Sequence, residues 1–178
     1  RRVAIMNIAE RYDLLVVEDN PYGLLGFDHE PMRALRARNA SRVIYLGSFS
    51  KTFSPGLRVG WVVGPADVVR RMSDLVTHSG AWAPRAEQIA TAGLLGQPAV
   101  IDAFQDGMRA GIRARLDAVH AHCTAMQRDG LPVDVVPPAA TMYLSARFDL
   151  SGLRTPSGAL LDTTDDIRSY LLDAAGFG

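Results

Sequence analysis

Short apolar runs alternate along the chain with longer segments in which apolar residues recur three or four positions apart. Runs that end in turn residues predict buried strands, and the wider spacing predicts amphipathic helices. We expect strands at 14–18, 43–46, 58–63, 133–136 and 141–148, and helices at 1–13, 31–38, 65–76, 85–95, 99–128 and 165–175. Helices and strands that follow one another in this order indicate an α/β protein.

Composition narrows the class of protein. The chain has 178 residues, 48% of them apolar, and a net charge of zero. These values fit a soluble globular protein of one or two small domains, and nothing basic enough for a nucleic-acid partner stands out. No apolar run approaches the ~18 residues of a membrane helix and no signal-peptide pattern opens the chain, so we expect no membrane partner. The single cysteine, Cys123, fits the reducing cytoplasm.

Two clusters of potential metal ligands have simpler explanations. His120 and His122 lie two positions apart in the segment expected to be helical, and such side chains point away from each other. The acidic pair at 165–166 suits the first turn of the last helix, for which Thr163 or Thr164 would be the cap. We therefore expect no metal site.

The most informative stretch, 43–63, contains the only lysine of the chain, Lys51. The other 18 basic residues are all arginines. A lysine that loses its proton becomes a nucleophile, whereas a guanidinium stays charged, so a solitary lysine hints at carbonyl chemistry, although it could also be an ordinary surface lysine. The strand expected at 43–46 places Lys51 on a loop at a strand end, which is where open α/β sheets bind ligands.

Ser48, Ser50 and Arg58 lie close to Lys51 in the sequence and form a candidate anion-binding site. Arginine offers paired donors to phosphate, and hydroxyls add neutral hydrogen bonds. A phosphate loop ending in Gly-Lys-Ser/Thr is excluded, because Ser50 occupies the position of its glycine.

A second strand end carries a carboxylate and a phenol. The apolar run at 14–18 leads into Asp19-Asn20-Pro21-Tyr22. Taken singly, Asp19 would be a turn residue and Tyr22 a packed aromatic. Because two strand ends of one sheet can face one pocket, we expect these side chains to lie near Lys51.

Together the motifs D-N-P-Y, S-F-S-K and P-G-L-R-V-G-W resemble the cofactor signature of class I/II aminotransferases, the fold type I enzymes that use pyridoxal phosphate. The resemblance runs over most of the chain and is most specific at 16–65. It implies a PLP-dependent transferase fold type I, with a mostly parallel sheet in a large domain and a smaller α/β domain. Residues 1–97 would be the C-terminal part of the large domain, and 98–178 the linking helix and part of the small one.

The resemblance also implies a role for each motif residue. Lys51 would form the internal Schiff base with the cofactor aldehyde, and Asp19 would pair with the protonated pyridine nitrogen. Tyr22 would donate a hydrogen bond to the phenolic oxygen of the ring. The cofactor phosphate would be held by Ser48, Ser50 and Arg58.

Other features of the family differ here or find no match. The loop from Lys51 to Arg58 is one residue shorter than in the aspartate aminotransferase pattern and resembles that of 2-aminoadipate aminotransferases. Ala139 and Ala140 stand where glycines are common. The phosphate-loop glycine, the aromatic that stacks on the pyridine and the arginine for the substrate carboxylate have no match, so we expect a fragment of a longer enzyme. Family members are commonly homodimers with shared active sites, which we expect here too.

Three functions agree with these residues. The first is an aminotransferase that moves an amino group between an amino acid and a 2-oxo acid. The second is a relative that uses the same cofactor for decarboxylation, elimination or oxygen-dependent oxidation of an amino acid. The third is a transcriptional regulator in which an aminotransferase-like domain senses an effector behind a DNA-binding segment. We favour the aminotransferase.

Overall fold

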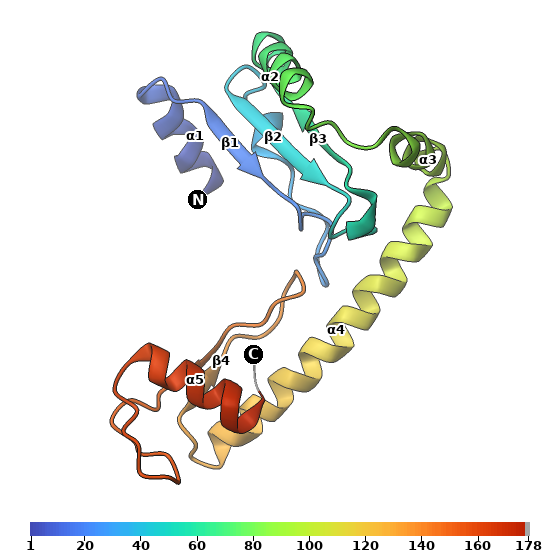
Figure 1. The fold of residues 1–178 in the computed structure, drawn as a ribbon. Coiled ribbons are helices and arrows are strands. Elements are labelled where there is room, and N and C mark those ends of the chain that lie inside the picture. Colours follow the sequence, from blue (N-terminus) through green and yellow to red (C-terminus); the bar gives the residue numbers. More distant parts are fainter. Residues whose placement is uncertain (177–178) are drawn as a thin grey trace. The chain divides into compact units, whose positions relative to one another are not determined.

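The computed structural model describes residues 1–176 (Figure 1), so the last two residues of the second expected domain lie outside the described part. One compact unit comprises Arg1–Gly111 with Ala139–Thr141, and another comprises Ile112–Pro138 and the residues from Met142 onward. Helix α4, Pro98–Arg128, contributes to both units. The boundary expected at residue 97 concerns the large and small domains that the resemblance implies, and it stays a prediction.

The first unit contains a three-stranded sheet with the strand order β1-β2-β3. β1 (Val16–Asp19) and β2 (Val43–Ser48) run parallel, and β3 (Gly60–Val63) runs antiparallel to β2. A parallel neighbour needs a long crossover connection, which 20–42 supplies, whereas the shorter segment 49–59 folds straight back. All three strands expected in this unit are confirmed, with ends shifted by about one or two residues.

A small hydrophobic core joins the first helix to this sheet. Helix α1 (Arg2–Arg11) buries Met6, which packs with Leu35 and Val43. Val16 of β1 packs against the same cluster. Because Leu35 belongs to the long connection between β1 and β2, the core also fixes that connection against one face of the sheet.

The other helices of the first unit largely match the pattern of apolar residues. Helices α2 (Ala66–Ser79) and α3 (Arg85–Leu95) form where they were expected, as does α4. The helix expected at 31–38 is wrong, because the structure has only a single 3-10 turn, η1 (Leu35–Ala37). A segment this short cannot offset the entropy of helix nucleation without more packing than Leu35 provides.

The second unit combines the end of α4 with a two-stranded sheet and a last helix. β4 (Val133–Val135) pairs antiparallel with β5 (Ala146–Phe148). Helix α5 (Thr164–Ala175) begins with a capping box, in which the Thr163 hydroxyl accepts from the Asp166 backbone N–H at 3.2 Å and the Asp166 carboxylate accepts from the Thr163 N–H at 2.9 Å. This identifies Thr163 as the cap.

The strand expected at 141–148 is too long, since only Ala146–Phe148 pairs as β5. Thr141 has a φ of 68°, in the left-handed region that interrupts a strand. Its backbone N–H donates to the Leu25 carbonyl at 2.8 Å, so this residue is bound to the first unit. Across residues 1–176, no helix is both long and apolar enough to cross a membrane.

Candidate functional site

The register of the sheet brings Asp19 and Ser48 to the same end and the same face. Asp19, the last residue of β1, pairs with Leu46 of β2, and the N–H of Asn20 continues the ladder to the Leu46 carbonyl at 3.1 Å. Side chains alternate between faces along a strand, so Leu46 and Ser48 project from one face, and Asp19 projects from that face with its partner. The two strand ends therefore meet as the sequence predicted.

Lys51 lies in a tight turn directly after β2. The backbone N–H groups of Phe53 and Ser54 both donate to the Phe49 carbonyl at 2.9 Å, which closes the turn around the lysine. Lys51 itself is half-buried, and within the described residues its ammonium has no hydrogen bond or ion-pair partner. No described contact therefore occupies the end of the Lys51 side chain.

The two serines of the candidate anion site lie at the start of this turn. The Ser48 hydroxyl accepts from the Ser50 backbone N–H at 3.0 Å, and both side chains are half-buried. Each hydroxyl still has a proton to donate, because neither hydroxyl donates to another described residue. Ser48 and Ser50 thus offer two neighbouring donors beside the lysine.

Arg58 precedes β3, and backbone pairing brings this segment back to the turn that carries Lys51. The Phe49 N–H donates to the Val59 carbonyl at 3.1 Å, so the residues just before β3 lie against the start of the lysine turn. Arg58 is exposed, and the one hydrogen bond of its side chain among the described residues is long, from Nη1 to the Pro55 carbonyl at 3.4 Å. Its φ of 53° is left-handed, which costs a non-glycine residue roughly 1–2 kcal/mol. Strained backbone of this kind clusters at functional sites.

Asp19 and Tyr22 line one cavity of about 430 Å³, within the usual size of a small-molecule site. Its wall also includes Gly26, His29 and Ala140. Ala140 reaches it because it forms an isolated β-bridge with Gly26. The Asp19 carboxylate is exposed and, like the Lys51 amine, has no partner among the described residues.

The structure thus groups the six predicted residues in two neighbouring sets. Asp19 and Tyr22 share the cavity, whereas the other four residues gather on the turns between β2 and β3: Ser48, Ser50, Lys51 and Arg58. The lysine set does not line that cavity. Because β1 and β2 run parallel, both sets lie at the same end of the sheet, where these two strands end.

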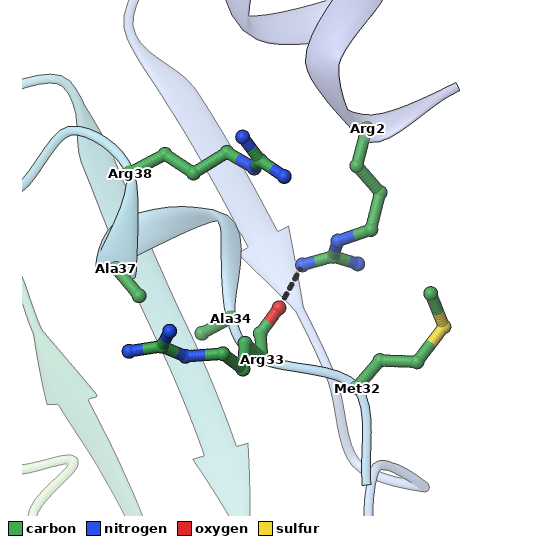
Figure 2. Close-up of a pocket in the computed structure, with 6 residues that line it drawn as sticks. All are labelled: Arg2, Met32, Arg33, Ala34, Ala37 and Arg38. Carbon is green, nitrogen blue, oxygen red and sulfur yellow. Dashed lines mark hydrogen bonds between the residues drawn. The ribbon is translucent and has the colours of Figure 1, made fainter.

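A second cavity, of about 540 Å³, is lined by three arginines, two alanines and Met32, and it shares Arg2 and Met32 with the first. Figure 2 shows the Arg2 guanidinium directed at the Arg33 carbonyl, to which it donates at 2.9 Å. Arg2 also pairs with the nearly buried Glu18 at 2.5 Å, and Glu18 accepts from the Leu35 N–H at 2.7 Å. These contacts fix the connection after β1 and so hold one wall of the Asp19 cavity in place.

Sequence analysis missed two residues beside the lysine. An added Cβ on Gly47 would lie 2.2 Å from the ring of Trp61, so only glycine fits under that ring. The Thr52 hydroxyl is buried and donates to the Ser48 carbonyl at 3.2 Å. A glycine inside an apolar strand is a signal of close approach, and it could have identified the first of them.

A comparison with known protein families identifies the family of this chain. The model of the family described as aminotransferase class I and II matches residues 3–176. The chain belongs to this family. The resemblance drawn from the three motifs is therefore confirmed, and with it the fold type I expected for the α/β chain.

Individual relatives include both enzymes and regulators. The chain is 42% identical over 73 residues to aromatic-amino-acid aminotransferase 1 of Thermococcus litoralis. The aligned segment covers 40% of this chain and 18% of that protein. The chain is also 37% identical over 98 residues to the HTH-type transcriptional regulator YisV of Bacillus subtilis, covering 54% of this chain and 20% of the regulator.

Among solved structures, the chain is similar to LysN, an α-aminoadipate aminotransferase of Thermus thermophilus. The TM-score is 0.69 and the sequence identity 26%, over 84% of this chain and 39% of LysN. The chain therefore spans about two fifths of the length of this aminotransferase.

Proposed function

We propose that this chain forms the lysine-bearing part of a pyridoxal-phosphate-dependent aminotransferase, which moves an amino group between an amino acid and a 2-oxo acid. One observation carries the proposal. The only lysine lies in a closed turn with no partner for its amine among the described residues, at the end of the sheet where a carboxylate and an anion cradle also lie.

The chemistry of these side chains fits pyridoxal phosphate. Two hydroxyls and a weakly engaged guanidinium suit a phosphate group, and a carboxylate without a partner in residues 1–176 suits a protonated ring nitrogen. The family supports the same cofactor, as does LysN, whose structure contains N-(5'-phosphopyridoxyl)-L-leucine. When bound, the cofactor supplies an aldehyde for attachment and a ring that draws the electron pair away from the substrate Cα.

Each predicted residue receives a task from this fit. Ser48 and Ser50 would donate their hydroxyl protons to phosphate oxygens, and Arg58, whose described side-chain contact to Pro55 is long, would add paired charged donations. These three residues would keep the cofactor in place when its bond to lysine is exchanged. Asp19 would accept the ring N–H and keep that nitrogen protonated. Tyr22 would donate to the ring oxygen.

Lys51 has two tasks. Its amine would hold the cofactor covalently by condensing with the aldehyde, with loss of water. Once released by the substrate, the Lys51 amine would carry a proton between the substrate Cα and the cofactor. Lys51 is half-buried, which limits the access of water to its amine. The homodimer expected from the family remains a prediction.

A regulatory domain is a second candidate, because the relative YisV is named as a transcriptional regulator. Such a domain would use the same lysine and cradle to hold the cofactor as part of an effector sensor. Decarboxylases, lyases and oxidases would also use these residues.

The first experiment is an absorption spectrum of the intact protein with pyridoxal phosphate, before and after borohydride, followed by peptide mapping. We expect a visible band that borohydride removes and a reduced cofactor attached at Lys51, with neither in Lys51→Arg. Absence of both from the wild-type protein would exclude the proposal.

Addition of an amino acid then separates the functions. Pyridoxamine phosphate and the matching 2-oxo acid are expected from transamination. Ammonia, carbon dioxide or hydrogen peroxide without pyridoxamine phosphate would indicate the other enzymes. Binding of an amino acid without turnover would favour the regulator.

A further inference from the structure

Thr52 follows Lys51 directly and is one of the few buried polar residues of the described chain, with 5% of its surface exposed. Its hydroxyl donates to the backbone carbonyl of Ser48 at 3.2 Å. The bond joins the residue after the lysine to the last residue of β2, and so spans the segment that carries the reactive amine.

This contact differs from the two bonds that close the turn on the Phe49 carbonyl, because it depends on a side chain. The two bonds to the Phe49 carbonyl use backbone N–H groups, which any sequence supplies. The bond from the Ser50 N–H engages the Ser48 hydroxyl, a proposed phosphate ligand. Thr52 instead holds the Ser48 carbonyl and leaves that hydroxyl free to donate.

The rest of the Thr52 side chain faces apolar surroundings. It lines a cavity of about 360 Å³ together with Phe49, Phe53, Trp61 and Thr91. A valine at position 52 keeps the shape and the apolar contacts but loses the donor, and a serine keeps the donor but loses the methyl group. The two substitutions therefore separate hydrogen bonding from packing.

We infer that Thr52 is a positioning residue for Lys51, whose hydroxyl bond to the Ser48 carbonyl fixes the turn and directs the amine toward the cofactor aldehyde. This inference rests on the proposed function of Lys51. Thr52 need not touch the cofactor, since it acts through the backbone on either side of the lysine. Loss of the bond leaves the turn closed by its backbone contacts but lets it move, so the amine reaches the aldehyde less often.

The chain offers a matched control in Thr91. It is 4% exposed and lines the same cavity, but its hydroxyl has no hydrogen-bond partner in the part of the chain that the structure describes. Thr91→Val therefore makes the same chemical change in the same surroundings without breaking a bond. Any effect shared by Thr52→Val and Thr91→Val comes from packing or polarity, and any difference comes from the Thr52 bond.

The test uses the intact protein freed of cofactor. The rate at which pyridoxal phosphate attaches to Lys51 is measured after borohydride trapping, and compared with the rate of Lys51 acetylation by acetic anhydride. We expect the ratio of attachment to acetylation to fall about five- to tenfold in Thr52→Val and to stay near the wild-type value in Thr52→Ser and Thr91→Val. An equal fall in Thr52→Ser, or an unchanged ratio in Thr52→Val, would overturn the inference.

Amide hydrogen exchange gives a readout that does not use the cofactor. We expect exchange of the Phe53 and Ser54 amides to be about five- to tenfold faster in Thr52→Val than in Thr91→Val, with the sheet amides unchanged. If wild-type Lys51 takes up no cofactor, the proposed function fails, and exchange still decides whether Thr52 holds the turn. If Thr52→Val does not fold, Thr52→Ala replaces it, and equal exchange in Thr52→Ala and the wild type would refute the role.

Discussion

Replacement of Gly47 by alanine would test how closely β2 and β3 are packed beside the site. A Cβ at position 47 would lie 2.2, 2.3 and 2.6 Å from three ring atoms of Trp61, the residue paired with it across the strands. Ordinary contact needs about 3.5–4.0 Å, so the ring must retreat by more than about 1 Å. That movement also disturbs the contact of Trp61 with Phe49, whose ring centroid is 4.7 Å away.

Gly47→Ala changes the free energy of unfolding through contributions of opposite sign. Alanine gains about 0.5–1 kcal/mol over glycine by reducing the entropy of the unfolded chain. Overpacking costs about 1–3 kcal/mol, and the aromatic contact is worth about 0.5–1.5 kcal/mol. We therefore expect Gly47→Ala to lower the free energy of unfolding by about 1–3 kcal/mol.

Urea unfolding of the intact protein, followed by tryptophan fluorescence, measures this change. Gly107→Ala is the control, because nothing lies within 4 Å of an added Cβ on this residue of α4, and we expect it to stabilise by about 0.5–1 kcal/mol. Gly47→Ala combined with Trp61→Leu should recover part of the loss. A Gly47→Ala protein as stable as the wild type would show that the ring does not depend on this glycine.

Three further predictions concern the site and the last helix. Asp19→Asn should still bind pyridoxal phosphate at Lys51 but transaminate at least about 10²-fold more slowly, because the neutral amide no longer keeps the ring nitrogen protonated; spectra and single-turnover rates measure the two effects. Arg58→Ala should weaken cofactor binding by about 10- to 100-fold, measured by equilibrium dialysis, because two weak donors cannot replace a paired charged one. The Thr163 hydroxyl, and then its backbone N–H, hold the pKa of Asp166 below its usual value. This stabilisation is present above the unfolded pKa of about 3.9 and is lost as pH falls through the lower folded value, so Asp166→Asn should flatten the loss of stability to urea as the pH falls below about 4.

The main elements could be predicted because local pattern and packing agree. The apolar runs before Asp19 and Ser48 form strands, and the long periodic segment before Gly130 forms α4. The strand expected at 141–148 was too long, because Thr141 is held in a left-handed conformation by the contact of its N–H with Leu25. That contact joins residues far apart in the sequence, and no local pattern indicates it.

The candidate site shows the same division. Lys51 and Asp19 could be proposed from the sequence because their chemistry is unusual for their positions and their motifs are specific. Thr52 could not, because the role inferred for it rests on burial and on one hydrogen bond to a backbone carbonyl, which no residue type reveals. Gly47 was open to prediction only as a glycine within a strand, and the ring that covers it comes from β3.

An enzyme and a regulator would need different residues of the candidate site. Holding the cofactor requires the Lys51 amine and an anion cradle, and both functions would keep these. Moving a proton at the substrate Cα also requires a ring nitrogen that stays protonated, and for this Asp19 must remain a carboxylate. A sensor that only binds an amino acid should therefore tolerate Asp19→Asn far better than an aminotransferase does. The register that pairs Asp19 with Leu46, at the end of the sheet where Ser48 also lies, is thus the feature on which the catalytic proposal depends most directly.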